Sequence, residues 1–120
     1  MVFEDNRIRR QKIINIVQEA EPYAEVHVFE QTVDALEYVQ QARPEVAFIS
    51  MEPEDGRGYF LVKKLSKMIP KINIIAVAKE YRYAQELMRL RVSGYISGDL
   101  TLESAKEELA NLRYSQNIYG

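Results

Sequence analysis

Apolar residues recur along the chain with two alternating periods, one helical and one extended. Arg7–Ala20 has its apolar residues at helical spacing, and Asp5 or Asn6 can cap the start of this helix. Pro22 follows closely and favours an end to the helix. The opening of the chain therefore predicts a helix of about four turns.

Four more segments have helical spacing, and three of them are bounded by a cap or a proline. Thr32 can cap the second helix, which ends before Pro44, and Thr101 can cap the last one. The predicted ranges are Val33–Arg43, Tyr59–Met68, Arg82–Arg91 and Leu102–Leu112. Polar Glu52–Gly58 is predicted to be a loop.

Short apolar runs separate these helices and predict strands. Glu25–Phe29 alternates polar and apolar residues, as in a half-buried strand. Val46–Ile49 is continuously apolar and Ile72–Ala78 nearly so, which favours strands covered on both faces. Gly94–Ser97 predicts a brief strand, and Met1–Phe3 is left to supply the first.

Strands that alternate with helices of this length indicate right-handed βαβ units and a parallel sheet. The predicted fold is an α/β class, three-layer (βα)5 flavodoxin-like sandwich with a five-stranded parallel sheet. Residues 1–113 form one domain, and polar residues 114–120 form a C-terminal tail or a truncated linker.

Composition then narrows the chemistry. The 120 residues include no cysteine and one histidine, which excludes disulfides, thiolate chemistry and clusters of His or Cys metal ligands. The net charge of −2 argues against direct binding of nucleic acid or of an anionic membrane by this domain. The N-terminus has no secretory signal, so the expected location is the cytoplasm.

Ligands of open parallel sheets gather beyond the carboxyl ends of the strands. The residues predicted at those ends are Glu4 and Asp5, Ser50, Ala78 and Gly98. These five residues form the candidate pocket, and no residue of the chain is assigned as catalytic.

The order and spacing of the motifs resemble a response-regulator receiver (CheY-like) domain. The run Pro44–Ser50 is similar to the family's P-D-x-x-x-x-D, which ends in the phospho-accepting aspartate, and Gly58 matches a family glycine beyond it. The run Val92–Gly98 resembles the family's A-x-G-Y-L-x-K. A closing stretch ending in Arg113 and Tyr114 is similar to receivers that precede a transcription-factor output domain.

The resemblance implies a mechanism that these residues match only in part. The family holds Mg²⁺ on an acidic pair and the acceptor aspartate, and Glu4 and Asp5 match that pair. However, Ser50 stands at the acceptor, Ala78 at the Thr/Ser position and Gly98 at the lysine position. The phosphorylation pocket is therefore predicted to be degenerate, although Tyr95 matches the aromatic residue of the family's switch.

Each candidate residue also has a purely structural interpretation. Glu4 and Asp5 can charge the N-terminus of the first helix, or they can retain a weak Mg²⁺ site. No metal site or other cofactor is expected beyond that weak Mg²⁺ binding. Ser50 has no nucleophile elbow around it and suits a hydrogen-bonded strand end.

The leading hypothesis is a pseudo-receiver, a regulatory and protein-interaction module that acts without phosphorylation and not as an enzyme. Its partner would be a protein or an attached output domain, and a homodimer through the fourth helix, fifth strand and fifth helix is possible. The candidate interaction face comprises Arg89, Arg91, Tyr95 and Asp99.

Two alternatives remain. The chain can be the N-terminal receiver of a two-component DNA-binding transcriptional regulator, whose output domain lies outside it. A flavodoxin-like enzyme is the third hypothesis, but it predicts a Ser/Thr-rich phosphate loop after the first strand, where the chain has acidic Glu4 and Asp5.

Overall fold

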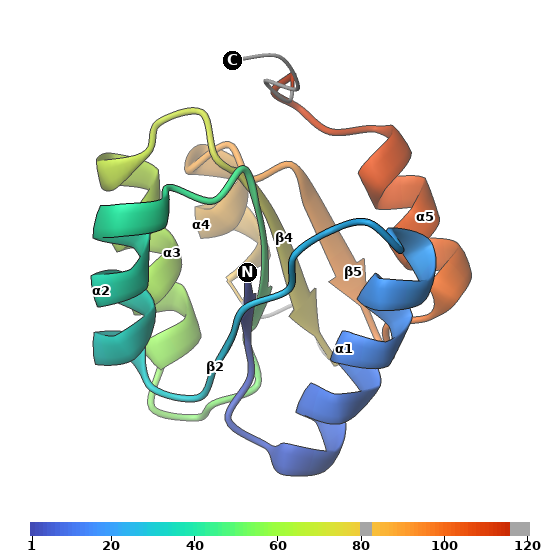
Figure 1. Cartoon of the computed structure of the whole chain (residues 1–120). Helices are drawn as coiled ribbons and strands as arrows, with labels where there is room; N and C mark the ends of the chain where they lie inside the picture. Colours follow the sequence, from blue (N-terminus) through green and yellow to red (C-terminus); the bar gives the residue numbers. More distant parts are fainter. Residues whose placement is uncertain (80–82, 116–120) are drawn as a thin grey trace.

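The computed structural model describes residues 1–79 and 83–115. Strands and helices alternate along the whole of this part of the chain (Figure 1). In chain order they are β1 (Val2–Phe3), α1 (Arg7–Ala20), β2 (Val28–Phe29), α2 (Thr32–Ala42), β3 (Val46–Ser50), α3 (Arg57–Met68), β4 (Asn73–Ala78), α4 (Ala84–Arg89), β5 (Gly94–Ser97) and α5 (Leu102–Ala110).

The five strands form one parallel sheet with the order β2-β1-β3-β4-β5. Helices α1 and α5 cover one face, and α2, α3 and α4 cover the other (Figure 1). The predicted fold class, a five-stranded flavodoxin-like sandwich, is therefore confirmed. The strand order reverses between β1 and β3, which places the crevice of such folds at their carboxyl ends.

Alternation along β4 divides its side chains between two apolar cores. Ile74, Ala76 and Ala78 pack with the buried residues of α2, α3 and α4. Ile75 and Val77 pack instead with those of α1 and α5. Both faces of the strand are buried, which explains why its sequence is apolar from Ile74 to Ala78.

Several elements match their predicted bounds. Helix α1 and strand β5 coincide with the predicted ranges, and Asn6 caps α1 by accepting a hydrogen bond from the amide of Arg9. Strand β3 extends one residue beyond its predicted end and includes Ser50. No helix in the described ranges is long and apolar enough to cross a membrane.

The edge strand and the third helix differ from their predicted bounds. The strand predicted over Glu25–Phe29 is limited to Val28–Phe29, because β2 pairs only with the two residues of β1. His27 precedes it and stacks on Tyr38. The loop predicted to reach Gly58 ends earlier, because Gly56 adopts φ 78° and the helix begins at Arg57.

Helix ends differ elsewhere as well. Thr32 is the first residue of α2 and not its cap, a position that Gln31 occupies without a side-chain hydrogen bond. Tyr83, at φ 58°, precedes α4, so this helix is shorter than predicted, and the predicted start at Arg82 lies outside the described residues. Thr101 caps α5 as predicted and forms a capping box with Ser104, but the helix ends at Ala110.

Candidate functional site

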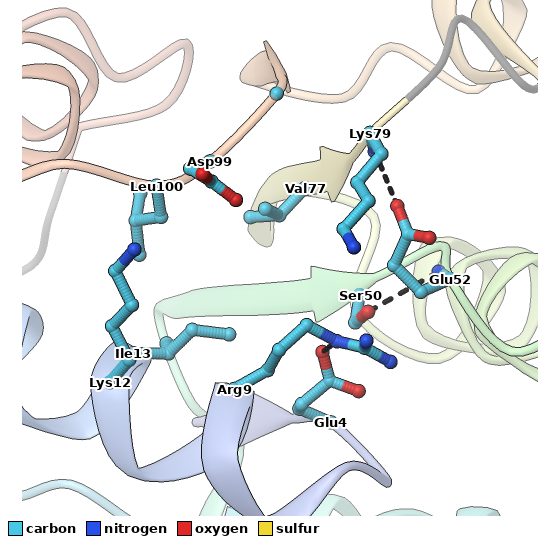
Figure 2. Close-up of a pocket in the computed structure, with 11 residues that line it drawn as sticks. Glu4, Arg9, Lys12, Ile13, Ser50, Glu52, Val77, Lys79, Asp99 and Leu100 are labelled. Carbon is cyan, nitrogen blue, oxygen red and sulfur yellow. Dashed lines mark hydrogen bonds and ion pairs between the residues drawn. The ribbon is translucent and has the colours of Figure 1, made fainter.

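A small cavity of about 40 Å³ opens at the carboxyl edge of the sheet, beside α1 (Figure 2). Three of the five predicted pocket residues line it, namely Glu4 after β1, Ser50 at the end of β3 and Gly98 after β5. Asp5 and Ala78 do not line it. Ala78 is instead buried in the core under α2, α3 and α4.

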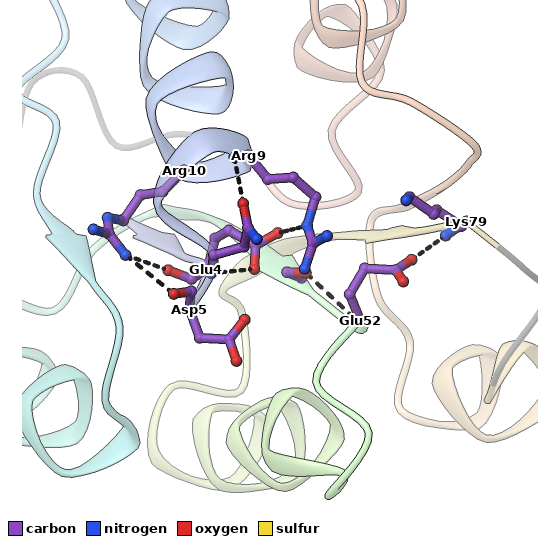
Figure 3. A network of polar contacts seen from close by, with 8 residues as sticks. Glu4, Asp5, Arg9, Arg10, Glu52 and Lys79 are labelled. Carbon is purple, nitrogen blue, oxygen red and sulfur yellow. Dashed lines mark hydrogen bonds and ion pairs between the residues drawn. The ribbon is translucent and has the colours of Figure 1, made fainter.

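The buried carboxylate of Glu4 is engaged by its own chain (Figure 3). Glu4 is 1% exposed, and its Oε1 accepts a hydrogen bond from Nε of Arg9 at 2.9 Å in an ion pair. Its Oε2 accepts from the backbone amide of Asn6 at 3.2 Å. The hydrogen bond to Glu4 raises the pKa of Arg9, so the guanidinium keeps its charge beside Ser50.

A second arginine holds the backbone that carries the acidic pair. Nη1 of Arg10 donates to the carbonyl oxygens of Glu4 and Asp5, at 3.2 and 3.4 Å, and to Oε2 of Glu30 at 3.2 Å. These contacts fix the turn between β1 and α1 (Figure 3).

Ser50 is connected to the loop that follows β3. Its Oγ accepts a hydrogen bond from the amide of Glu52 at 3.3 Å, and the Glu52 carboxylate accepts one from the amide of Lys79. Figure 2 shows the side chains of Arg9 and Lys79 reaching toward Ser50 from opposite sides. Both cationic side chains line the cavity together with Ser50.

Charges around the cavity balance one another. The acidic lining residues are Glu4, Glu52 and Asp99. The basic ones are Arg9, Lys12 and Lys79. The predicted pocket residues come from strand ends only and do not include the basic residues of α1. Arg9 and Lys12 lie on the helix face that carries buried Ile13, which is the signal in the sequence that could have identified them.

Two glycines shape the backbone of the site. A Cβ on Gly58 would lie 2.1 Å from the carbonyl oxygen of Ser50, so only glycine lets α3 approach the end of β3 this closely. Gly98 adopts φ 97°, a conformation that strains any L side chain although a Cβ there would meet open space. A lysine at position 98 would therefore require a different backbone.

The candidate interaction face is spread along β5. Tyr95 is half-buried on the strand, where it packs against the core under α4. Arg89 and Arg91 lie before the strand, at its amino end, whereas Asp99 follows its carboxyl end and lines the cavity. The two arginines and Asp99 therefore lie at opposite ends of β5.

The match to known families covers almost the whole chain. Residues 1–110 match the response regulator receiver domain. The chain belongs to this family. Receiver domains are non-enzymatic signalling modules of two-component signal transduction, and they interact with kinases and output domains.

Solved structures of receiver domains share the fold at low sequence identity. The response regulatory domain of the mrkE protein from Klebsiella pneumoniae has 20% identity and a TM-score of 0.80, and the match covers 92% of this chain and 91% of that one. A LuxR family DNA-binding response regulator from Staphylococcus aureus has 18% identity and a TM-score of 0.78, with 91% and 92% covered.

A CheY-like receiver domain protein from Methanospirillum hungatei has 15% identity and a TM-score of 0.77, with 91% of this chain and 87% of that one covered. No curated protein sequence matches the chain. At these identities the solved structures establish the receiver fold.

Proposed function

We propose that this receiver domain acts without phosphorylation, as a regulatory module that works through protein contacts. The observation that carries the proposal is the ion pair between Glu4 and Arg9 beside Ser50. The position that resembles the family's phospho-acceptor carries a hydroxyl, which cannot form an acyl phosphate. The adjacent acidic residue, Glu4, is already paired with Arg9 of the same chain.

The neighbouring strand ends support the same proposal. Ala78 has no hydroxyl to donate to a phosphoryl group, and Gly98 has no side chain to pair with one. The positive φ of Gly98 also disfavours any L side chain at the position that resembles the family's lysine. Both the nucleophile and the groups that stabilise its product are replaced.

The donor set does not fit the Mg²⁺ ion that the family uses. Mg²⁺ is bound by carboxylate and water oxygens in a near-octahedral arrangement. Here the carboxylate of Glu4 is held by Arg9, and the third position is the hydroxyl of Ser50. The adjacent guanidinium also repels a divalent cation, so Mg²⁺ binding is weak at most.

Output in this proposal passes through α4, β5 and α5 to a protein partner, an attached domain or a second copy of the chain. Tyr95 lies at the centre of this surface on β5, and Arg89, Arg91 and Asp99 flank the strand. Because Ala78 offers no hydroxyl to follow a phosphoryl group, Tyr95 is expected to keep one rotamer.

A phosphate mimic tests the proposal directly. Beryllofluoride and Mg²⁺ are added to the labelled domain, and amide NMR shifts are followed. No saturable shift is expected around Ser50 and Tyr95 at sub-millimolar mimic. Saturable shifts at both residues would overturn the proposal, and a conventional receiver domain run in parallel shows that the reagent is active.

A second candidate function is the receiver of a DNA-binding regulator, which one structural observation favours. The side chain of Asn73 holds both backbone groups of Tyr114, donating to its carbonyl at 2.9 Å and accepting from its amide at 2.8 Å. The path of the chain beyond α5 is thereby fixed against β4, as suits a connection to another domain. Sequencing the reading frame past Gly120 decides this, since an immediate stop codon would contradict it.

A further inference from the structure

A second concavity lies at the opposite, amino edge of the sheet. A groove of about 390 Å³ runs between the C-terminal part of α3 and the end of α4. The segment after α5 completes its wall through Tyr114. In Figure 1 these segments lie at the upper end of the molecule, opposite the end toward which the arrows of β4 and β5 point.

Every charged residue that lines this groove is basic. They are Lys63 and Lys67 from α3 and Arg89 and Arg91 at the end of α4. All four are exposed, and within residues 1–79 and 83–115 none of them forms a salt bridge. The cavity at the other edge has three acidic residues among its basic ones, whereas no acidic residue lines this groove.

The dipoles of the two helices balance only part of this positive charge. Lys67 and Arg89 lie in the last turns of their helices, where a cation interacts favourably with the helix dipole. Each helix end supplies roughly half a negative charge, which is too little to balance four cations. Nζ of Lys63 lies 4.6 Å from the centroid of the Tyr59 ring, and this cation–π contact does not neutralise the positive charge.

The wall of the groove is held in place by a buried polar network. Asn73 is 1% exposed, and its side chain binds the backbone of Tyr114 and the hydroxyl of Ser93, the latter at 2.7 Å. Ser93 accepts in turn from the amide of Arg113 at 2.9 Å. The groove is thus formed before any ligand binds, which lowers the entropic cost of binding.

We propose that this groove binds an acidic peptide segment of a protein partner. Four cations in a preformed groove match a run of carboxylates, and Leu90 and Tyr114 offer apolar contact between the charges. A nucleic acid is disfavoured because the domain has a net charge of −2 and the basic residues are confined to one short groove. The groove lies apart from the pocket beside Ser50, but it shares Arg89 and Arg91 with the proposed output face, so the inference deepens the proposed function at that face.

The test measures binding of a fluorescein-labelled Glu/Asp-rich octapeptide containing one Tyr and one Leu, by fluorescence anisotropy at low salt. A peptide with Gln and Asn in place of the acids serves as the ligand control. The groove variant is Lys67→Gln/Arg89→Gln. The matched variant, Lys64→Gln/Lys106→Gln, removes the same charge from exposed positions that do not line the groove.

The acidic peptide should bind and the neutral one should not. The groove variant should weaken binding about fivefold to tenfold, and the matched variant less than about twofold, as expected for two solvent-exposed ion pairs. Amide shifts in the wild-type domain should map to Ser66, Leu90 and Tyr114. Circular dichroism establishes that both variants are folded.

Three outcomes would overturn the proposal. Equal weakening by both variants would show a general effect of net charge. Tighter binding of a 20-base-pair DNA duplex than of the peptide, lost in the groove variant, would assign the surface to nucleic acid. Self-association in sedimentation experiments that the groove variant abolishes would assign it to a second copy. None of these outcomes bears on phosphorylation.

Discussion

Glu4 is a buried acid whose compensation comes from one flexible side chain. The carboxylate is 1% exposed, whereas the side chain of Arg9 is 37% exposed, so the pair is only partly shielded from solvent. Removing one partner of such a pair leaves the other buried without its counter-charge, which costs more than the pair itself contributes. The ion pair therefore has a structural role as well as the proposed one in the pocket.

We expect Arg9→Met to destabilise the domain by about 1–3 kcal/mol, because Glu4 loses a charged hydrogen bond. Urea unfolding measures this loss. Adding Glu4→Gln to the variant should recover most of the stability, since the buried group is then neutral. The control is Arg57→Met, which removes an exposed ion pair with Asp55 and should change stability little. No recovery in the double variant would contradict the assignment.

The strand-end residues of the site were predictable because strand ends follow from apolar periodicity. Ser50, Ala78 and Gly98 stand where the sequence places them, at or just beyond β3, β4 and β5. The contribution of Arg9 was not predictable in this way. Its partner and its orientation depend on how α1 packs over the sheet, which local patterns do not encode.

At the scale of elements, bounds set by local sequence signals were predicted correctly, and bounds set by tertiary pairing were not. Helix α1 and strand β5 have clear local signals, and their predicted bounds are confirmed. Strand β2 is shorter because its neighbour β1 offers only two residues for pairing. Helix α4 is preceded by Tyr83 in a left-handed conformation, which no local pattern predicts for this residue type.

Glu108 on α5 is expected to make the stability of the domain depend on pH. Glu108 on α5 lies over Gly94 of β5, where an added Cβ would be 2.0 Å from its Oε2. Partial burial, and then repulsion by Glu107, raises the pKa of Glu108 above its ordinary value. The folded state therefore binds this proton more tightly than the unfolded state, and stability from protonated Glu108 is lost as pH rises through the folded pKa.

Glu108→Gln should consequently stabilise the domain at neutral pH, where the wild-type side chain is ionised. The gain is small, about 0.5 kcal/mol, because solvent still reaches the carboxylate. Thermal unfolding measured from pH 3 to pH 8 should show the gain disappearing at the acid end, where both side chains are neutral. A gain that is constant across this range would contradict the titration, and Glu37→Gln on α2 controls for net charge.

At the scale of the whole molecule, charge is distributed unequally between the two edges of the sheet. The carboxyl edge, where receivers handle phosphate, has balanced acidic and basic residues. The amino edge has a groove whose charged lining residues are all basic. In the proposed function, this arrangement replaces a switch driven by added charge with surfaces whose charges are permanent.

The proposal predicts that ligand binding and switching can be restored in separate steps. Ser50→Asp alone should bind Mg²⁺ weakly, because the guanidinium of Arg9 remains beside Glu4. A unit charge at about 4 Å contributes about 1–4 kcal/mol, so adding Arg9→Met should strengthen Mg²⁺ binding by at least about fivefold. Amide NMR titration with Mg²⁺ measures both affinities, and equal affinities would show that Arg9 does not oppose the ion.

Switching should still be absent in that double variant. With Mg²⁺ and beryllofluoride present, shifts should stay near position 50 and not reach Tyr95, because Ala78 cannot form a hydrogen bond to the mimic. Adding Ala78→Ser supplies the hydroxyl and should extend the shifts to Tyr95 and α4. Propagation without the serine would show that the scaffold transmits the signal by another route. The loss of switching would then lie in the acceptor site alone.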